Sequence, residues 1–488
     1  MKLLNRSTFV AKKYPTKILQ FGDGNFLRAF IDWMVYELNK STNFNAGITV
    51  IKARQGKGKL ETLNAQEGLY TLFLKGVKKG EVKKEHCVID CINEGINPYD
   101  NFESYFNQAE NPNLQFLVSN TTEAGIVFNA DDKLTDKPQT SFPAKVTAFL
   151  YQRFKIFNGD KNKGLIFFPC ELIDDNGLKL QEIVLKYAKI WKLETSFISW
   201  IINHNVFCNT LVDRIVSGYP KDKIDAIQEN LGYKDQLIVE SEYYHLFVIE
   251  APINIQKKFP ADTIGLNVIF TDDIKKYKTI KVRILNGAHT ALVPLGYLYG
   301  LNTVRECLEN AVIKALLKNL VANEICSTLN FTKKELILYT NDVFDRFENP
   351  YLEHKLMSIS LNSISKFKTR LLPSILEYIA IKNSLPQNLL FSLAALIVFY
   401  KGKRNDVAIL LNDDDEVLRF FKNVFKSSNN SFTMTQAVLS NTDLWGTDLT
   451  QHQGLHSQVK LYYEAIIDKG MKAALESLYH LTLAKDPN

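Results

Sequence analysis

The sequence has little of several features that mark special classes of protein. It contains 6 cysteines in 488 residues, too few for a disulfide framework. The longest apolar run, residues 389–400, is interrupted by Ser392 and falls short of the ~20 residues that a membrane-spanning helix requires. The first residues contain no apolar signal-peptide core. We therefore expect a cytoplasmic protein with reduced thiols and no membrane partner.

The excess of one sign of charge over the other is also small. Lys and Arg number 59 and Asp and Glu number 53, a net charge of +6 that is spread along the chain. So small an excess gives no case for a nucleic-acid partner, although it suits an anionic small molecule. Hydrophobic residues make up 46% and charged residues 23%, which is typical of a globular protein. The length predicts two or three domains.

No pattern of metal ligands stands out. Cys87 and Cys91 lie four residues apart with His86 beside them. No second pair of ligands follows at the spacing of a zinc site, so we expect no metal.

Short apolar runs alternate with helical patterns in the first half of the chain. The expected strands cover residues 17–22, 47–52, 86–92, 114–120 and 164–170, and the expected helices include 25–39, 142–157 and 178–191. Such alternation predicts βαβ units and a largely parallel sheet.

After about residue 275 only long helical patterns are apparent. They cover residues 304–326, 332–347, 373–382, 387–400, 413–425 and 458–483. We therefore predict an α/β domain at 1–272, of the Rossmann type that binds dinucleotides, and an all-α domain at 273–488 that carries the substrate and catalytic groups.

A glycine pair follows the first expected strand and opens a helix. Gly22 permits a tight turn, and Gly24 lets the backbone approach a pyrophosphate, with Asn25 and Phe26 next in the chain. The third glycine of the usual fingerprint is replaced by Leu27. A dinucleotide site is the favoured interpretation, and an ordinary strand-to-helix turn is the alternative.

The end of the second strand normally distinguishes NAD from NADP. An acid there binds the ribose 2′-hydroxyl of NAD, and an arginine suits the 2′-phosphate of NADP. This chain has no acid at the position but has Arg54, in a basic loop that continues through Lys57 and Lys59. The residues alone are consistent with NAD, with NADP, or with a solvated loop that binds neither cofactor.

Asn120 and Thr121 follow the fourth expected strand at its carboxyl end, where open α/β sheets bind ligands. They are candidates for hydrogen bonds to the nicotinamide ribose. The alternative is a helix start, with a threonine cap and Glu123 in the first turn.

The segment 281–290 has the most specific chemistry. At ~100° per residue on an α-helix, His289 lies near 80° and Asn286 near 140° from Lys281. A desolvated lysine serves as a general base, and an asparagine donates to a developing alkoxide or carbonyl oxygen. These groups suit the oxidation of an alcohol. The alternative is an amphipathic helix in which Lys281 and Arg283 face water and His289 is a core residue.

Two further sites supply candidate charges. Asp213 follows an apolar stretch and is a candidate for orienting Lys281, with a local ion pair to Arg214 as the alternative. The basic run that contains Lys368 and Arg370 is a candidate for binding an anionic substrate, or else a solvated face.

Taken in order, these segments resemble the mannitol dehydrogenase family of polyol-specific long-chain dehydrogenases. The similarity lies in residues 18–30, 119–125, 169–173, 210–215, 283–290, 366–370 and 445–446. The resemblance implies a Rossmann-type domain, a helical domain, an active site between them, and an NAD-dependent reaction without a metal. It places the catalytic lysine, asparagine and histidine at Lys281, Asn286 and His289, an active-site aspartate at Asp213, and a late site lysine close to Lys368.

One departure bears on the substrate. The family's mannitol enzymes resemble Cys-Asp-Asn-Ile where this chain has Cys-Glu-Leu-Ile at residues 170–173, so Leu172 replaces a second oxyanion donor and argues against mannitol. We expect a sugar acid instead. A hypothesis of another class is a dinucleotide-binding sensor without catalysis. The complete set of Lys281, Asn286 and His289 argues against it, since a sensor needs no base.

Overall fold

The computed structural model describes residues 1–56, 58–122, 124–404, 406–427 and 430–483. The chain forms two compact units. One comprises residues 1–75 and 83–277, and the other comprises 76–82 and 278–488. The short segment 76–82 therefore belongs with the helical unit, where the Gly80 amide donates to the Asp345 carboxylate at 3.4 Å.

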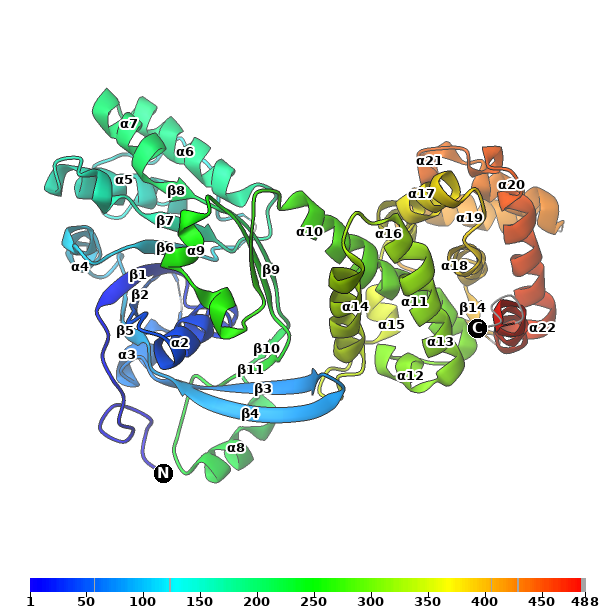
Figure 1. Ribbon diagram of the computed structural model, residues 1–488, viewed down its shortest axis with the longest axis horizontal. Coiled ribbons are helices and arrows are strands. Elements are labelled where there is room, and N and C mark those ends of the chain that lie inside the picture. The colour runs from blue at the N-terminus through cyan, green and yellow to red at the C-terminus, as the bar shows by residue number, and fades with distance from the viewer. Residues whose placement is uncertain (57, 123, 405, 428–429, 484–488) are drawn as a thin grey trace. The chain divides into compact units, whose positions relative to one another are not determined.

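A parallel sheet of six strands forms the centre of the first unit (Figure 1). Its order is β5-β2-β1-β6-β7-β8, and every adjacent pair is parallel. The strands are β1 (Thr16–Phe21), β2 (Gly47–Ile51), β5 (Ile92–Ile96), β6 (Phe116–Ser119), β7 (Ile166–Pro169) and β8 (Val206–Phe207). The predicted α/β class with a largely parallel sheet is confirmed.

Both faces of this sheet are covered by apolar side chains. Along β1, Ile18 belongs to one core cluster, whereas Leu19 and Phe21 belong to another on the opposite face. The elements that contribute to these clusters include α2 (Ile31–Ser41), α5 (Phe142–Ile156), α6 (Asn176–Ile190) and α7 (Thr195–His204). Burial on both faces explains why the strands are almost continuously apolar in sequence.

The prediction of a single strand at 86–92 is wrong. The structure has two strands, β4 (Glu81–Ile89) and β5, with a break at Asp90 and Cys91. The Arg6 guanidinium donates to the carbonyls of Asp90 and Ile92 at 2.9 and 3.2 Å and so holds this corner. An apolar run alone cannot reveal such a break, because both flanking segments are strands.

Two smaller sheets have only one strand with a counterpart in the sequence prediction, β4, which overlaps the strand expected at 86–92. One has the order β10-β11-β3-β4 and the other β13-β12-β9. Their remaining strands are β3 (Tyr70–Lys78), β9 (Asn209–Asp213), β10 (Val216–Gly218), β11 (Val239–Glu242), β12 (Leu246–Glu250) and β13 (Val268–Thr271).

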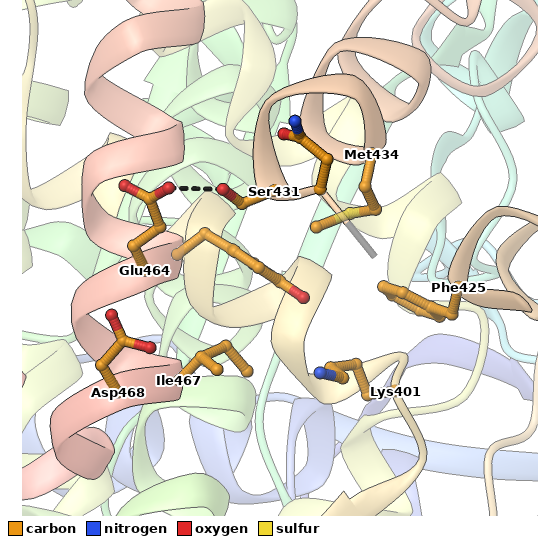
Figure 2. A pocket seen from close by; sticks show the side chains of 9 residues that line it. Lys401, Phe425, Ser431, Met434, Glu464, Ile467 and Asp468 are labelled. Carbon is orange, nitrogen blue, oxygen red and sulfur yellow. Dashed lines mark hydrogen bonds between the residues drawn. The ribbon is translucent and has the colours of Figure 1, made fainter. Parts of the chain in front are cut away.

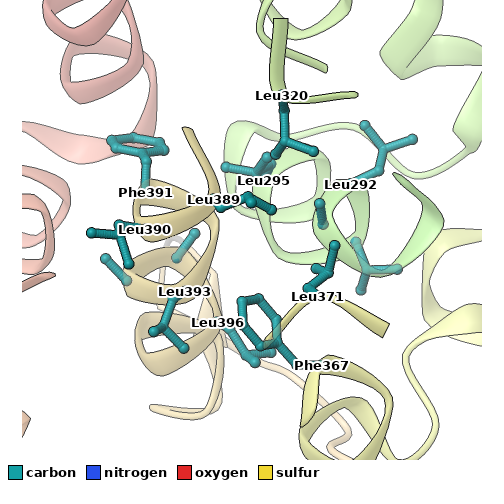
Figure 3. Close-up of a cluster of buried hydrophobic side chains, with 14 of the residues drawn as sticks. Leu292, Leu295, Leu320, Phe367, Leu371, Leu389, Leu390, Phe391, Leu393 and Leu396 are labelled. Atoms are coloured by element: carbon teal, nitrogen blue, oxygen red, sulfur yellow. The ribbon is translucent and has the colours of Figure 1, made fainter. Parts of the chain in front are cut away.

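The second unit is helical and is built around an apolar helix. Every residue of α18 (Gln387–Phe399) after Gln387 is buried. Figure 3 shows Leu389, Leu393 and Leu396 of this helix among side chains of neighbouring elements, including Leu292 and Leu295 of α11 (Gly287–Tyr299). A helix that is apolar on all sides is a core helix when it is this short. None of the described helices has the length and apolarity to cross a bilayer.

Several helix predictions need correction. The helix expected at 304–326 is divided into α12 (Val304–Glu309), α13 (Ala311–Asn319), a π-helix η6 (Leu320–Ile325) and η7 (Cys326–Thr328). The division follows from Asn310, whose side chain accepts the amides of Val312 and Ile313 and starts a new helix. Strands also occur beyond residue 275, because β14 (Lys403–Arg404) pairs with β15 (Val407–Ala408).

The other predicted helices of this unit are present with shifted ends. They are α14 (Lys333–Phe347), α17 (Leu372–Lys382), α18, α19 (Asp415–Ser427) and α22 (Leu455–Leu483). Gly470, at φ 79° and ψ 160°, interrupts α22 with a kink. All six cysteines are free thiols, and all but Cys87 are buried.

Candidate active site

The glycine turn lies at the carboxyl end of β1. Gly22 has φ +125°, and a Cβ there would lie 3.1 Å from the carbonyl oxygen of Asn120, so the turn requires glycine on both counts. Gly24 precedes α1 (Asn25–Arg28), and a Cβ at Gly24 would meet nothing within 4 Å. The backbone is thus open on the side where a ligand would approach.

The helix expected at 25–39 is broken. α1 has four residues and is separated from α2 by Ala29 and Phe30. A helix this short has a weak dipole, since the dipole sums over aligned peptide units. The positive charge at this turn comes instead from side chains, because Asn25 Oδ1 accepts from Arg28 Nη2 at 2.6 Å and from Lys59 Nζ at 3.0 Å.

Other contacts fix the same turn. The Asp23 carboxylate accepts the backbone amide of Lys59 at 2.7 Å. Burial lowers the pKa of the Lys59 ammonium, and the charge of Arg28 lowers it further. Phe26 stacks on Phe30 with ring centroids 4.9 Å apart, which makes it a packing residue of the turn. In the sequence, Lys59 is recognisable only as part of a basic loop.

Arg54 is exposed in the loop that follows β2. A pocket of about 840 Å³ lies beside this loop, and Lys52 lines it. Three carboxylates line the same pocket, from Glu61, Glu94 and Asp100. These acids come from α3 (Leu60–Ala65), from β5 and from the turn after it, so no local motif could have revealed them.

The loop after β6 is held by a buried carboxylate. Glu171 accepts the Thr121 amide and hydroxyl at 2.9 and 2.8 Å through one oxygen, and the Ser119 hydroxyl at 3.0 Å through the other. Burial raises the pKa of Glu171, and the hydrogen bonds from Thr121 oppose that rise. Asn120 donates to the Cys170 carbonyl at 2.7 Å. No role for Glu171 is apparent from the sequence alone.

The same loop contains a strained residue and a pocket. Thr122 has φ 90°, which a β-branched residue seldom adopts, and such strain often occurs at functional sites. A pocket of about 480 Å³ is lined by Asn120, Thr122, Ala124, Glu171 and Leu172. Leu172 is 63% exposed there, so the position that lacks the second oxyanion donor adjoins an open cavity.

Asp213 is the last residue of β9, paired in register with Leu246 of β12. It belongs to the first unit, whereas Lys281 belongs to the second. Its orienting role stays a prediction. The alternative partner Arg214 is buried and donates to backbone carbonyls of Glu242 and Ala29.

Lys281 and Asn286 are the two ends of a π-helix. This element, η5 (Lys281–Asn286), continues directly into α11. A π turn bonds residues five apart, so these two side chains lie about one turn apart on one face, not at the ~140° of an α-helix. The angles expected from the sequence are therefore wrong for this segment. Short π segments occur frequently at functional sites.

Arg283 is buried, so the alternative in which it faces water is wrong. It is 6% exposed and donates to Ser374 Oγ at 2.7 Å. Its Nη2 lies 2.7 Å from a carboxylate oxygen of Glu377. Arg283 therefore anchors the π-helix to α17.

His289 packs between two rings. Its imidazole stacks on Phe347 with centroids 4.1 Å apart and meets the ring of His354 edge-on at 5.6 Å. Its Nε2 is buried and has no hydrogen-bond partner among the described residues. Burial lowers the pKa of His289, and the charges of His354, Arg346 and Arg370 lower it further. The ring is therefore neutral near pH 7 and keeps one nitrogen available.

The two basic residues at 368 and 370 differ in their surroundings. Arg370 Nη1 donates to Thr290 Oγ1 at 3.2 Å, and Thr290 donates to the Asn286 carbonyl at 2.8 Å. Lys368 Nζ instead lies 3.4 Å from the Asp443 carbonyl, beside Gly446. Of the two, Arg370 lies next to the segment that carries Asn286 and His289.

A pocket in the helical unit involves none of the predicted site residues. It measures about 350 Å³. Figure 2 shows Lys401 and Phe425 across the pocket from Glu464 and Asp468 of α22. The Ser431 hydroxyl donates to the Glu464 carboxylate. The described residues hold no group of three or more side chains arranged to bind a metal.

Comparison with known proteins identifies the class. Residues 16–261 match the model of the mannitol dehydrogenase Rossmann domain, and residues 273–467 match that of the mannitol dehydrogenase C-terminal domain. These matches cover most of the chain, which therefore belongs to the mannitol dehydrogenase family, as the sequence resemblance predicted.

Two curated relatives of the chain are altronate oxidoreductases. The altronate oxidoreductase of Bacillus subtilis is 47% identical over 478 residues, 98% of either chain. That of Yersinia enterocolitica is 44% identical over 480 residues, 97% of this chain and 99% of its own.

Solved structures share the fold. D-sorbitol dehydrogenase in substrate-free form has a TM-score of 0.78 at 21% identity, covering 97% of this chain and all of its own. Pseudomonas fluorescens mannitol 2-dehydrogenase, solved as a ternary complex with NAD and D-mannitol, has a TM-score of 0.62 at 21% identity, covering 98% of this chain and all of its own.

Proposed function

We propose that the chain is an NAD-dependent oxidoreductase that interconverts D-altronate and D-tagaturonate by metal-independent hydride transfer. The names of the relatives support the substrate, since they match at 43–47% identity over nearly the whole chain. The free thiols and the lack of a membrane-spanning helix among the described residues favour action in the cytoplasm.

One observation carries the chemical part of the proposal. The π-helix brings Lys281 and Asn286 to one face, and His289 follows on α11 with a buried ring nitrogen that lacks a partner. A buried polar atom without a partner is costly, so its retention indicates that a ligand supplies the missing hydrogen bond.

In oxidation, the Lys281 amine takes the proton of the reacting hydroxyl as that oxygen becomes a carbonyl. The Asn286 amide and His289 hold the oxygen while charge develops on it. We assign Asp213 to orient Lys281, and Lys368 and Arg370 to the substrate carboxylate. When bound, NAD accepts the hydride. In reduction the same lysine, protonated, returns the proton.

The first unit offers groups that suit the cofactor. We assign Gly22, Gly24, Asn25 and the backbone amide of Phe26 to its diphosphate, and Asn120 and Thr121 to its nicotinamide half. The open side of Gly24 and the rigid Glu171–Thr121 contact support this assignment. Arg54 keeps NADP as an alternative. The acids that line the neighbouring pocket favour NAD, because they repel a 2′-phosphate.

An assay of the purified protein tests the proposal. We expect NADH to form from altronate and NAD, and tagaturonate to be reduced in reverse. The comparison assays use mannonate or mannitol with NAD, and altronate with NADP. Rapid turnover of mannonate without turnover of altronate would support the nearest alternative, mannonate oxidoreductase (fructuronate reductase), and turnover of mannitol alone another polyol dehydrogenase. Tight NADH binding without turnover of any of them would favour the sensor.

A further inference from the structure

We propose that Arg283 is a positioning residue of the catalytic segment, because its buried hydrogen bonds hold the π-helix η5 that keeps Lys281 and Asn286 on one face. The inference rests on the proposed oxidoreductase function, in which these two residues are the general base and the oxyanion donor. Arg283 is given no contact with substrate or cofactor. It acts through the backbone that carries the other two side chains.

The π-helix needs such support because an α-helix is the ordinary course of a helical segment. π turns are rare, and they occur mostly as single turns within α-helices. Here η5 continues directly into α11, so an α-helical course through residues 281–286 is the competing conformation. In that conformation Asn286 would lie ~140° around the axis from Lys281. The two side chains would then no longer face one substrate oxygen together.

Arg283 is placed to fix the rotation of this turn. It lies two residues after Lys281 and three before Asn286, about half a turn from each, so its side chain points away from theirs. Its Nε donates to Ser374 Oγ at 2.7 Å, and its Nη1 and Nη2 donate to the two carboxylate oxygens of Glu377 at 3.3 and 2.7 Å. A guanidinium is a rigid planar fork, so such paired bonds fix its direction as well as its distance.

The partners of Arg283 are themselves held in place. Ser374 and Glu377 lie three residues apart on one side of α17, and Ser374 is fully buried. Thr328 of η7 accepts from Nη2 at 3.2 Å and donates to the Ile325 carbonyl at 2.7 Å. The side chain of Glu377 is 47% exposed, so water can solvate its carboxylate when the arginine is replaced. We therefore expect variants at position 283 to fold.

A close packing contact fixes the end of the same turn. A Cβ at Gly287, the residue after η5, would lie 3.1 Å from Leu371 Cδ2 and 3.6 Å from the carbonyl oxygen of Arg370. The end of the π-helix therefore packs directly against the chain that leads into α17. Because α17 also carries two partners of Arg283, both the middle and the end of the turn are tied to the same part of the unit.

The first test compares Arg283→Met and Glu377→Gln with the control Arg305→Gln. Methionine keeps much of the length of the side chain without its hydrogen bonds, and glutamine keeps one acceptor oxygen. Arg305 is an exposed arginine of the same unit, paired with Glu309 at 2.8 Å. We expect kcat for altronate to fall about 10- to 100-fold in Arg283→Met, the effect of a displacement of about 1 Å, and to fall less in Glu377→Gln. The KM for NAD should stay close to wild type, and Arg283→Lys should recover only part of kcat.

A double-mutant cycle separates positioning from general stability. The loss of kcat caused by Arg283→Met is measured in the wild type and in an Asn286→Ala background, in which the relative placement of Lys281 and Asn286 no longer matters. We expect the second loss to be within about three-fold, since the effects of coupled residues are not additive. An equal loss in both backgrounds would show a merely structural role. Unchanged kcat in both Arg283→Met and Glu377→Gln would equally overturn the inference.

The catalytic variants separate this inference from the proposed function. If Asn286→Ala and Lys281→Ala lose activity but Arg283→Met does not, the inference is wrong and the proposed function stands. If another alcohol replaces altronate as best substrate and the cycle measured with it shows the same coupling, the inference stands and the altronate assignment fails. Wild-type activity in both Asn286→Ala and Lys281→Ala would refute the catalytic assignment and, with it, the positioning role.

Discussion

The glycine turn of the first unit and the π-helix of the second differ in the groups that they leave open to a ligand. At the glycine turn, Asn25 accepts from Arg28 and Lys59 and Asp23 accepts the Lys59 amide, while the Arg28 Nε is buried without a partner among the described residues and the backbone is open at Gly24. Beside the π-helix, the side chains of Arg283 and Thr290 have hydrogen-bond partners, but His289 has a buried ring nitrogen without a partner among the described residues.

This difference matches two kinds of task. A cofactor that binds in every turnover can be recognised by backbone and by side chains that hydrogen bonds hold in place. A reacting alcohol needs side chains whose protons move, and those groups cannot all be paired within the protein. We therefore expect substitutions in the second region to affect turnover, and substitutions in the first to affect cofactor affinity and stability.

The largest effect should come from Lys281. Removing the base in Lys281→Ala should lower kcat by roughly 10²- to 10⁴-fold, the usual contribution of a general base. The KM for NAD should change little, as measured by initial rates at saturating altronate. Lys382→Ala, at the exposed end of α17, is the matched control. Full activity in Lys281→Ala would assign the base to another residue.

The next effect should come from His289. His289→Leu should lower kcat/KM for altronate by about 100-fold, the low end expected for a group that bonds the reacting oxygen. The free energy of unfolding should stay the same or rise, because the unpartnered nitrogen is lost. Chemical denaturation measures that stability, and exposed His204→Leu is the control. A marked loss of stability would instead make His289 a structural residue, and the contrast between the regions would disappear.

A third prediction compares one buried acid in each unit. Burial raises the pKa of Asp32 to about 7 in the first unit and that of Glu324 to about 7 in the second. The folded protein then holds protons that the unfolded chain releases above about pH 4, so stability should fall as pH rises from 4.5 to 8. We expect a loss of roughly 2–4 kcal/mol per group over this range, since each unit of pKa shift is worth about 1.4 kcal/mol.

Separate probes can assign this loss to each unit. Trp445 lies in the second unit and the other three tryptophans lie in the first, so Trp445→Phe leaves fluorescence from the first unit alone. Asp32→Asn should flatten the pH dependence of that signal, and Glu324→Gln should leave it unchanged. An equal response to both substitutions would show that the units unfold together.

Local patterns in the sequence predict the regular elements of both units. β1, β2, β6 and β7 begin and end within two residues of their predicted bounds, because each is a short apolar run closed by a glycine or polar residues. The helical second half was equally evident from its apolar spacing. Lys281, Asn286 and His289 were selected because they share a short segment.

What the sequence missed depends on contacts between distant residues. The π turn at 281–286 has no local signal, since its partners Ser374 and Glu377 lie about 90 residues away. Phe347 and His354 contact the His289 ring through the packing of α14 and of the segment that follows it. Glu171 is separated from Thr121 by 50 residues, although parallel strands β6 and β7 bring them together.

The smallest effect should come from Glu171. It tests the expectation that substitutions in the first region affect cofactor affinity. Glu171→Ala leaves the Ser119 hydroxyl and the Thr121 amide and hydroxyl without their acceptor, so the loop after β6 should loosen. We expect the KM for NAD to rise about 10-fold, worth about 1.4 kcal/mol, with kcat within a factor of about three. Glu171→Gln keeps one acceptor oxygen and should recover part of this affinity. Glu182→Ala, an exposed acid on α6 of the same unit, is the control for stability. If Glu171→Ala instead lowers kcat and leaves NAD affinity intact, the buried carboxylate acts on the chemical step, and the division of tasks between a bonded frame and reactive side chains is wrong.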